Sequence, residues 1–303
     1  MHTILGSNGT IGNELSKQLI NFTENIRQVS RHPKKVNNTD QLMVADLLNS
    51  KATSEAVAGS EVVYLVAGLP YKLSVWQQQW PVVMHNVINA CKEHNARLVF
   101  FDNVYCYGYV EGIMTEETPF NPSSKKGDVR AEIANMLLNE MQTGNITAMI
   151  ARSADFYGPD AVLSFPYATV FQRLKVGKSP QWLGKAEKIH TFTYTPDAGK
   201  ALAVLAQSEK AWGQTWHLPT SKELLTAKDF VRIACDLAGQ AYQLQIAPDW
   251  LMKIMGWFIP VIRENEEMMY QLNNDYHFDS SKIELAYDLK ATAYKDGIAK
   301  CLE

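Results

Sequence analysis

The chain has no surplus of basic residues, few cysteines and no long apolar run, and each absence narrows what it can do. Its 29 Lys and Arg are outnumbered by 32 Asp and Glu, so the formal net charge is −3 at pH 7. Binding to a nucleic-acid backbone needs a basic patch or stripe, which this balance does not offer. We therefore expect small molecules rather than nucleic acids as partners.

The cysteines are far apart in the sequence and form no CxxC pair: they are Cys91, Cys106, Cys235 and Cys301. Disulfide frameworks and zinc sites need closely or regularly spaced cysteines. The spacing therefore predicts free thiols, no bound metal, and a reducing compartment such as the cytoplasm.

Neither a membrane span nor a targeting segment is expected. Residues 1–6 contain no basic region and no long apolar stretch. The most apolar later segment, residues 250–262, is interrupted by Lys253, Gly256 and Pro260 and is shorter than the roughly 20 residues that cross a bilayer. We expect it to form a packed helix that ends at Pro260, with a ligand lid or a dimer face as the alternative.

The first 160 residues alternate short apolar runs with amphipathic stretches, a pattern typical of a parallel sheet with helices on both faces. Strands are expected at residues 3–5, 26–30, 41–44, 61–67, 97–102 and 146–151, and helices at residues 81–94 and 129–141. Between the first two strands, Ile11, Leu15, Leu19 and Phe22 recur at helical spacing and predict another helix. The predicted fold class is α/β, with a doubly wound parallel sheet.

Beyond Arg152 this alternation is lost, and Gly and Pro interrupt shorter segments. Helices are expected at residues 227–239, 250–258 and 264–272, which predicts a smaller, mostly α C-terminal lobe. A helix at residues 197–206 is expected to return to the main sheet. The predicted division is therefore a dinucleotide-binding domain at residues 1–160, joined by residues 185–210, and a substrate-binding lobe at residues 161–184 and 211–303.

A glycine-rich turn follows the first strand and carries the functional signal. It reads Gly6-Ser7-Asn8-Gly9-Thr10-Ile11-Gly12, which is GxxGxxG spacing. Such a turn between a strand and a helix lets the backbone approach a pyrophosphate and directs N–H groups and the helix dipole at its charge. An ordinary tight turn also uses glycine, but the flanking strand, helix and second strand favour a Rossmann-type nicotinamide dinucleotide site.

The end of the second strand distinguishes NADP from NAD. An acidic residue there accepts a hydrogen bond from the ribose 2′-OH, whereas an arginine accommodates a 2′-phosphate. This strand ends at Arg31, with Lys34 and Lys35 close behind and no carboxylate, so NADP(H) is favoured and NAD(H) is the alternative. Asp46 is placed either against the adenine amino group or as a helix N-cap.

Taken together, several short segments resemble the extended short-chain dehydrogenase/reductase superfamily, in its NAD-dependent epimerase/dehydratase branch. The resemblance covers essentially the whole chain. It is carried by residues 6–12, 66–68, 103–108, 116–119 with Pro122, 152–159 and 190–197.

The resemblance implies a role for each position of the cofactor site. Gly6, Asn8, Gly9, Thr10, Ile11 and Gly12 would hold the pyrophosphate. Arg31 would bind the 2′-phosphate, Asp46 and Leu47 the adenine, and Ala67 and Gly68 the ribose on the nicotinamide side. In that family the substrate is often a nucleotide sugar.

The catalytic positions depart from the family pattern. The family has a Ser or Thr four residues before the Tyr of its VYG-like segment, followed by a Tyr and a Lys in a YxxxK helix. The corresponding residues here are Asn103, Lys126 and Arg130. The family's usual Asn on the helix after the fourth strand aligns with Val82, and Asn86 follows one turn later.

The missing tyrosine matters because that phenol moves the proton that accompanies hydride transfer. Arginine does not deprotonate at pH 7, so Arg130 is expected to be a fixed cation over the cofactor ribose or a substrate anion. Lys126 is the candidate acid/base, provided that burial and neighbouring cations favour its neutral amine; two atypical groups of the superfamily use a lysine near this place. The alternative is a solvated lysine or a phosphate clamp.

Four tyrosines are candidates for the same proton-donating role. They are Tyr71, Tyr105, Tyr107 and Tyr157, each of which can equally be a packed residue with a satisfied hydroxyl. His190 and His217 have the same two interpretations.

The sequence thus predicts an NAD(P)-dependent epimerase/dehydratase-like oxidoreductase that acts on a carbonyl or alcohol carbon, with Asn103 polarising the carbonyl. The alternative is a non-catalytic NADP(H)-binding sensor, which would tolerate the loss of all three usual catalytic residues. The resemblance further implies a homodimer formed through the helices at residues 81–94 and 129–141.

Overall fold

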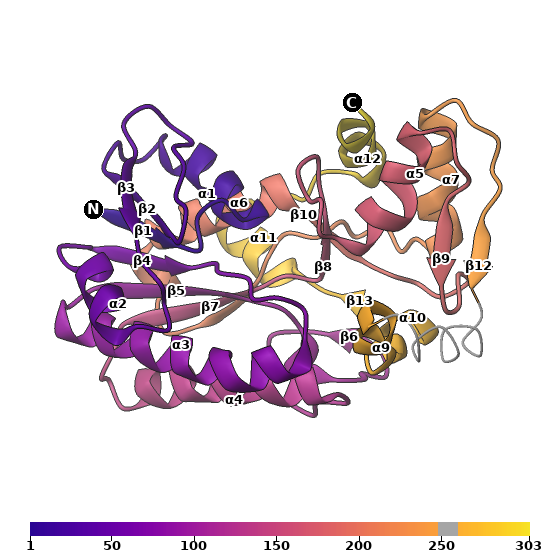
Figure 1. The fold of residues 1–303 in the computed structure, drawn as a ribbon. Coiled ribbons are helices and arrows are strands. Elements are labelled where there is room, and N and C mark those ends of the chain that lie inside the picture. Colours follow the sequence, from indigo (N-terminus) through magenta and orange to yellow (C-terminus); the bar gives the residue numbers. More distant parts are fainter. Residues whose placement is uncertain (248–259) are drawn as a thin grey trace. The chain divides into compact units, whose positions relative to one another are not determined.

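The structure, a computed structural model, describes residues 1–247 and 260–303 (Figure 1). The helix expected at residues 250–258 lies outside the described residues. The described chain forms two compact units. The first comprises Met1–Cys106, Lys126–Arg152 and Ala198–Trp216, and the second Tyr107–Lys125, Ser153–Asp197 and His217–Glu303. The functional division into a dinucleotide-binding domain and a substrate lobe stays a prediction.

The first unit is built on a seven-stranded sheet with the order β11-β7-β5-β4-β1-β2-β3. Its strands are β1 (His2–Leu5), β2 (Ile26–Ser30), β3 (Gln41–Val44), β4 (Val62–Leu65), β5 (Arg97–Asp102), β7 (Ala148–Arg152) and β11 (Thr215–His217). Neighbouring strands from β3 to β7 pair in parallel. Every residue of β1, β4 and β7 is buried, as expected for strands covered on both faces.

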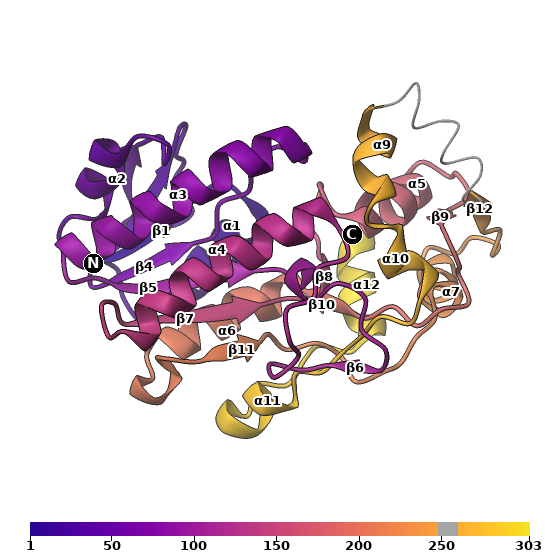
Figure 2. The same cartoon turned by 90° about the horizontal axis from the view of Figure 1, so that it is seen from below.

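Helices cover both faces of this sheet, so the predicted doubly wound fold is confirmed. Figures 1 and 2 show α1 and α6 on one face and α2, α3 and α4 on the other. Their bounds are α1 (Thr10–Leu19), α2 (Ser50–Val57), α3 (Leu73–Glu93), α4 (Lys125–Gln142) and α6 (Thr195–Ala206). Because β1 and β4 are neighbours while the chain turns in opposite directions from them, the carboxyl edge between these two strands is the switch point of the sheet, where ligands bind in such folds.

Several predicted bounds were wrong. Helix α3 begins at Leu73, eight residues before the expected start, and contains Pro81 in its interior. Its first turns bury Trp76 and Trp80, and this packing outweighs the preference of proline for a helix start. Helix α1 ends at Leu19, so Phe22 is 48% exposed and does not extend the buried face. The single helix expected at 264–272 is two, α9 (Pro260–Glu266) and α10 (Met269–Asn273).

The second unit combines short strand pairs with helices. The strand pairs are β8 (Asp155–Tyr157) with β10 (Phe192–Tyr194), β9 (Gln181–Leu183) with β12 (Gln245–Ala247), and β6 (Ile113–Met114) with β13 (His277–Phe278). The helices α5 (Gln172–Lys175), α7 (Ala227–Leu237), α11 (Ser281–Tyr287) and α12 (Tyr294–Leu302) accompany them, with a short turn at Tyr167–Phe171. Two further short turns lie at Tyr105–Tyr107, where the chain passes from the first unit to the second, and at Glu209–Ala211 in the first unit. The core of this unit is aromatic and is centred on Tyr157, Phe192 and Phe230.

All four cysteines are buried and free. Within the described part of the chain, no helix is both long enough and apolar enough to cross a bilayer.

Candidate cofactor and catalytic site

The glycine turn after β1 has a geometry that only glycine permits at its first position. Gly6 has a φ of +99°, and a Cβ added there would come within 2.3 Å of the Cα of Ala67. The amides of Gly6 and Ser7 continue the β1–β2 ladder by donating to the carbonyl of Val29, at 2.9 and 3.1 Å. The absent Cβ therefore allows the chain segments that follow β1 and β4 to approach each other closely at the switch point.

The other two glycines keep the turn compact at the start of α1. A Cβ on Gly12 would come within 3.1 Å of the carbonyl oxygen of Gly6, and one on Gly9 within 3.3 Å of the same atom. Gly9 is the N-cap of α1, and no side chain caps this helix. Helix α1 is ten residues long and begins at the carboxyl edge of the sheet. Its first-turn amides are those of Thr10, Ile11 and Gly12. These features fit a dinucleotide diphosphate, which needs close backbone approach and first-turn N–H groups.

The side chain of Asn8 lies against the loop that follows β2. Its Nδ2 donates to the carbonyl of His32 and to Ser30 Oγ at 3.5 Å, and its Oδ1 accepts from the amide of Lys34 at 3.0 Å. Arg31 sits inside this clamped stretch and is exposed. The predicted pyrophosphate residue is thus tied to the predicted 2′-phosphate loop.

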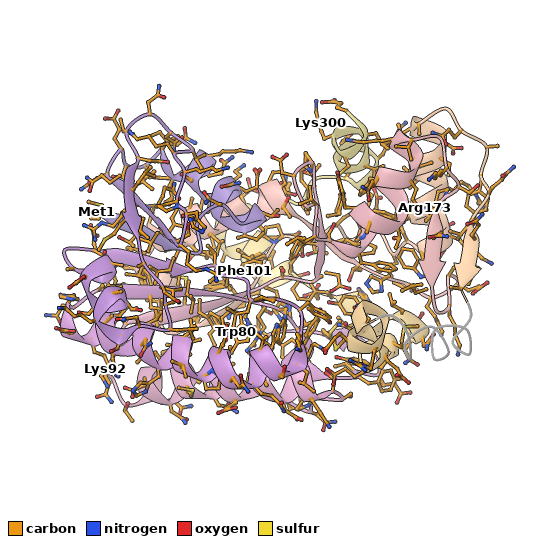
Figure 3. The ribbon with its side chains drawn as sticks, viewed as in Figure 1. Met1, Trp80, Lys92, Phe101, Arg173 and Lys300 are labelled. Atoms are coloured by element: carbon orange, nitrogen blue, oxygen red, sulfur yellow. The ribbon has the colours of Figure 1, made fainter. Side chains whose placement is uncertain are left out.

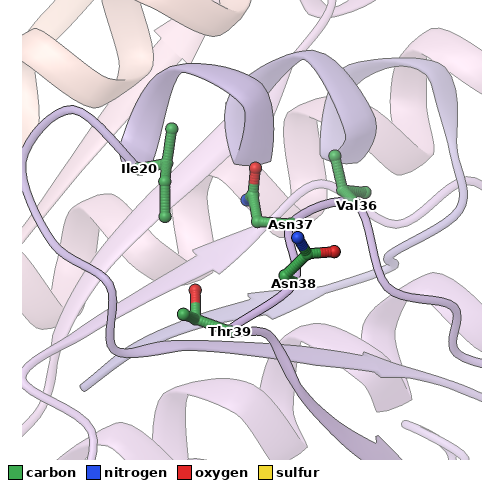
Figure 4. A pocket seen from close by; sticks show the side chains of 5 residues that line it. All are labelled: Ile20, Val36, Asn37, Asn38 and Thr39. Carbon is green, nitrogen blue, oxygen red and sulfur yellow. The ribbon is translucent and has the colours of Figure 1, made fainter.

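The same loop is held at its far end by Asp40, which is 2% exposed. One carboxylate oxygen, Oδ2, accepts from the amides of Val36 and Asn37 at 2.9 Å each and from Gln28 Nε2 at 2.9 Å. A shallow surface pocket lies beside these hydrogen bonds of Asp40. It is lined by Ile20, Val36, Asn37, Asn38 and Thr39 (Figure 4). Because it lies between the end of α1 and the start of β3, it is at the opposite edge of the sheet from the glycine turn.

Asp46 is not the helix N-cap that the sequence offered as one alternative. That position belongs to Asn49, whose side chain accepts from the amide of Ala52, whereas Asp46 Oδ1 accepts from the amide of Leu48 at 3.0 Å in the preceding turn. Asn86 on α3 donates from Nδ2 to the carbonyl of Leu47 at 2.9 Å. The loop assigned to adenine is thereby fixed to α3 by the asparagine that follows Val82 by one turn.

A buried ion triad lies at the carboxyl ends of β5 and β7. Asp102, 1% exposed, accepts from Arg130 Nε at 2.8 Å and from Arg130 Nη2 through Oδ1, and from Arg152 Nε at 3.1 Å through Oδ2. Asp102 and Arg152 are register partners in the sheet. Arg130 is therefore held by a carboxylate beneath it.

Aromatic rings from α3 and β5 pack against the Arg130 guanidinium. Its central carbon lies 4.6 Å from the ring centre of Trp80 and 5.1 Å from that of Phe100. Figure 3 shows the Trp80 side chain on the side of α3 that faces the sheet, and this residue is only 3% exposed. Arg130 is itself 4% exposed, and its charge is paired with an internal carboxylate. Its expected place over the cofactor ribose or a substrate anion stays a prediction.

Lys126 is fully buried at the start of α4, which excludes a solvated lysine. Its Nζ lies 4.8 Å from the ring centre of Tyr71. Asn103, directly after β5, accepts from the amide of Tyr105 through Oδ1 at 3.0 Å. This bond orients the side-chain amide of Asn103, the group expected to polarise a carbonyl.

Two of the four candidate tyrosines are core residues. Tyr157 is 1% exposed among aromatic rings, and burial raises the pKa of its phenol, which disfavours the charged form and any acid/base role. The hydroxyl of Tyr107 lies 2.8 Å from His217 Nε2. Tyr71 lies near the candidate Lys126, whose Nζ is 4.8 Å from its ring centre, and the ring of Tyr105 stacks on Trp76.

Both histidines are packed and hydrogen-bonded. His217 Nδ1 lies 2.8 Å from the carbonyl of Asp279, which only accepts, so Nδ1 carries a proton and Nε2 accepts from the Tyr107 hydroxyl when the ring is neutral. His190 is 3% exposed, pairs with Asp155 at 3.0 Å and stacks on Tyr276.

Sequence reasoning missed the roles of Asp102, Trp76 and Trp80. A carboxylate that ends a buried strand, with an arginine ending the neighbouring strand, was a usable signal for the triad. No comparable signal marked the tryptophans, because they precede a proline, a residue that is typical of a helix start.

Comparisons with known proteins identify a family and a shared fold. A model of the NAD dependent epimerase/dehydratase family matches residues 2–217. Among curated proteins, dTDP-glucose 4,6-dehydratase of Mycobacterium tuberculosis (strain CDC 1551 / Oshkosh) is 22% identical over 172 residues, which is 54% of this chain and 52% of that protein. This chain thus matches about half the length of that relative. The enzyme of the same name from Mycolicibacterium smegmatis is 21% identical over 241 residues, 72% of each chain.

Solved structures share the fold along the whole chain. The dTDP-glucose 4,6-dehydratase of Streptomyces venezuelae, crystallised with NAD and TYD, has a TM-score of 0.81 at 16% identity, covering 100% of this chain and 96% of its own. The UDP-glucose 4-epimerase of Thermus thermophilus, in complex with NAD, has a TM-score of 0.80 at 17% identity, covering 100% and 98%. At these identities the likeness establishes the fold.

Proposed function

Because this chain belongs to the NAD-dependent epimerase/dehydratase family, we propose that it is an NAD(P)-dependent oxidoreductase acting on a carbonyl or alcohol carbon of a small molecule. The observation that carries the proposal is Gly6, whose missing Cβ lets the segments after β1 and β4 meet at the switch point. The substrate class with most support is a nucleotide sugar, the class named for its relatives and structural neighbours. Family membership and the burial of Lys126 favour an enzyme over a non-catalytic sensor.

In the proposed cofactor site, the first-turn amides of α1 bind the diphosphate. Asp46 and Leu47 would hold the adenine, and Ala67 and Gly68 would hold the ribose on the nicotinamide side. Arg31 binds a 2′-phosphate, so NADP(H) is preferred over NAD(H). The observed exposure of Arg31 supports this assignment.

A nicotinamide dinucleotide held in this site would supply or accept the hydride of the proposed reaction. The side-chain amide of Asn103 donates a hydrogen bond to the substrate oxygen and stabilises the charge that develops there. Lys126 Nζ gives that oxygen a proton during reduction and takes it back during oxidation. Arg130 is a positioning residue, because its charge is committed to Asp102.

The test uses the purified full-length protein with NADPH or NADH and a panel of aldehydes, ketones and nucleotide sugars. We expect turnover that Lys126→Ala reduces by at least about a hundredfold, the usual contribution of a general acid/base, while NADPH still binds. Lys125→Arg is the matched control, because this neighbouring side chain is exposed and keeps its positive charge, so turnover should be unchanged. Tight NADPH binding without turnover of any substrate would favour the sensor instead.

We also propose a homodimer formed through α3 and α4, in a reducing compartment such as the cytoplasm. The two helices lie side by side in the first unit, joined by the ion pair between Lys92 and Glu140 at 2.9 Å, and Val82 on α3 is 42% exposed. The free, buried cysteines support the compartment. Light scattering after gel filtration should give a mass of two chains, and Val82→Glu should shift it to one.

A further inference from the structure

The loop between β2 and β3, residues 31–40, carries a local concentration of positive charge. Arg31, Lys34 and Lys35 fall within five residues, and all three are exposed. Loops of this composition are ordinarily mobile, because solvated cations repel one another and gain little from packing. This loop is instead fixed by hydrogen bonds at both ends.

At the far end, buried Asp40 accepts the amides of Val36 and Asn37, and Asn37 Nδ2 donates to the carbonyl of Ser16 at 3.0 Å. These hydrogen bonds attach the second half of the loop to α1. Residues 31–34 are ordered from the near end, whereas Lys35 Nζ donates within the loop to the carbonyl of Asn38 at 2.9 Å.

At the near end, the side chain of Asn8 holds the loop through hydrogen bonds from both of its polar atoms. Nδ2 donates to the carbonyl of His32, and Oδ1 accepts from the amide of Lys34, so one side-chain amide spans three consecutive loop residues. Asn8 adopts a φ of +71°, a left-handed conformation that asparagine tolerates better than most residues. That conformation belongs to the glycine turn, so the clamp couples the turn to the cationic loop.

We propose that Asn8 is a specificity-determining positioning residue: it holds residues 31–34 in place so that their cations receive a phosphate monoester on the cofactor ribose. The inference rests on the proposed NADP(H) preference and deepens it. Without the clamp, binding of the 2′-phosphate would have to order the loop at that moment, and the cost would reduce affinity. A cofactor without the 2′-phosphate does not use the loop cations and does not meet this cost.

Removing the side chain of Asn8 should therefore weaken the binding of NADP⁺ but not that of NAD⁺. Asn8→Gly removes both side-chain hydrogen bonds, while glycine keeps the backbone conformation at φ +71° without strain. The Kd for NADP⁺ should rise about tenfold, which corresponds to about 1.4 kcal/mol. The Kd for NAD⁺ should stay within about twofold, because glycine keeps the backbone amide of residue 8 in the pyrophosphate turn and the first-turn amides of α1 are untouched.

Calorimetric titration of the full-length protein with NADP⁺ and with NAD⁺ measures both constants. Hydrogen exchange over residues 31–36 supplies a second readout and should be faster in Asn8→Gly. Asn95→Gly is the matched control, since Asn95 is also exposed and has a φ of +53°, but lies after α3 at the other edge of the sheet. This variant should change neither Kd.

Arg31→Ala separates the inference from the proposed function. If the wild type prefers NADP⁺ and Arg31→Ala removes the preference while Asn8→Gly retains it, the clamp has no role and only this inference fails. Equal weakening of both cofactors by Asn8→Gly would likewise overturn it, because Asn8 would then act through the diphosphate. If the wild type shows no preference and Arg31→Ala changes nothing, the proposed 2′-phosphate site fails and the inference fails with it.

Discussion

Asp102→Asn tests whether the ion triad holds the catalytic region together. The substitution is isosteric, but it leaves Arg130 and Arg152 without the carboxylate that both now contact. Removing one partner of a buried pair costs roughly 3–5 kcal/mol, because the remaining charge stays desolvated. At about 2.1 cal/mol/K of unfolding entropy per residue, the 303-residue chain should lose about 5–8 °C in Tm.

Urea unfolding followed by circular dichroism, with a thermal scan alongside, measures this loss. Asp128→Asn is the matched control, because Asp128 is an exposed carboxylate on the same helix as Arg130 and should change stability by less than about 0.5 kcal/mol. In Asp102→Asn/Arg130→Met, one orphaned charge is also removed, so the loss should be smaller than the sum of the two single losses. A single-variant loss below about 1 kcal/mol would refute the reasoning, since it would mean that the two guanidiniums find other compensation.

Two further predictions concern the glycine turn and the thiols. Gly6→Ala should abolish cofactor binding and lower stability, because its Cβ would overlap the backbone after β4. In Gly68→Ala the added Cβ would meet nothing within 4 Å, so this variant should keep wild-type stability and weaken binding alone. Equal melting temperatures for the two variants would contradict this prediction. Burial raises the pKa of Cys91, Cys106 and Cys301 to about 12, so these thiols should resist alkylation at about pH 8.5 until the chain is unfolded. Because the pKa of these thiols is higher in the folded protein than in the unfolded chain, their burial contributes stability that is fully present below about pH 9 and is lost as the pH rises towards about 12. A free energy of unfolding that does not fall over that range would contradict the burial of the thiols.

The local pattern was enough to predict the sheet and its cofactor edge. Apolar runs separated by amphipathic stretches indicated a doubly wound fold, and the glycine spacing marked the turn, because both depend on neighbours in the sequence. The same local reasoning failed at α3. There, Pro81 looked like a helix start, and only the packing of Trp76 and Trp80 against the sheet extends the helix before it.

The catalytic region depended on contacts that sequence reasoning cannot supply. Arg130 and Arg152 lie 28 and 50 residues beyond Asp102 along the chain, and their pairing follows from strand register and from where α4 passes the end of β5. Asn8 and Lys34 are 26 residues apart and meet only across the β1–β2 edge. The sequence by itself determined the kind of ligand, because diphosphate recognition needs one local turn. Only the tertiary structure decided which charged side chains are buried in ion pairs and which stay exposed, because burial and pairing arise when distant segments pack together.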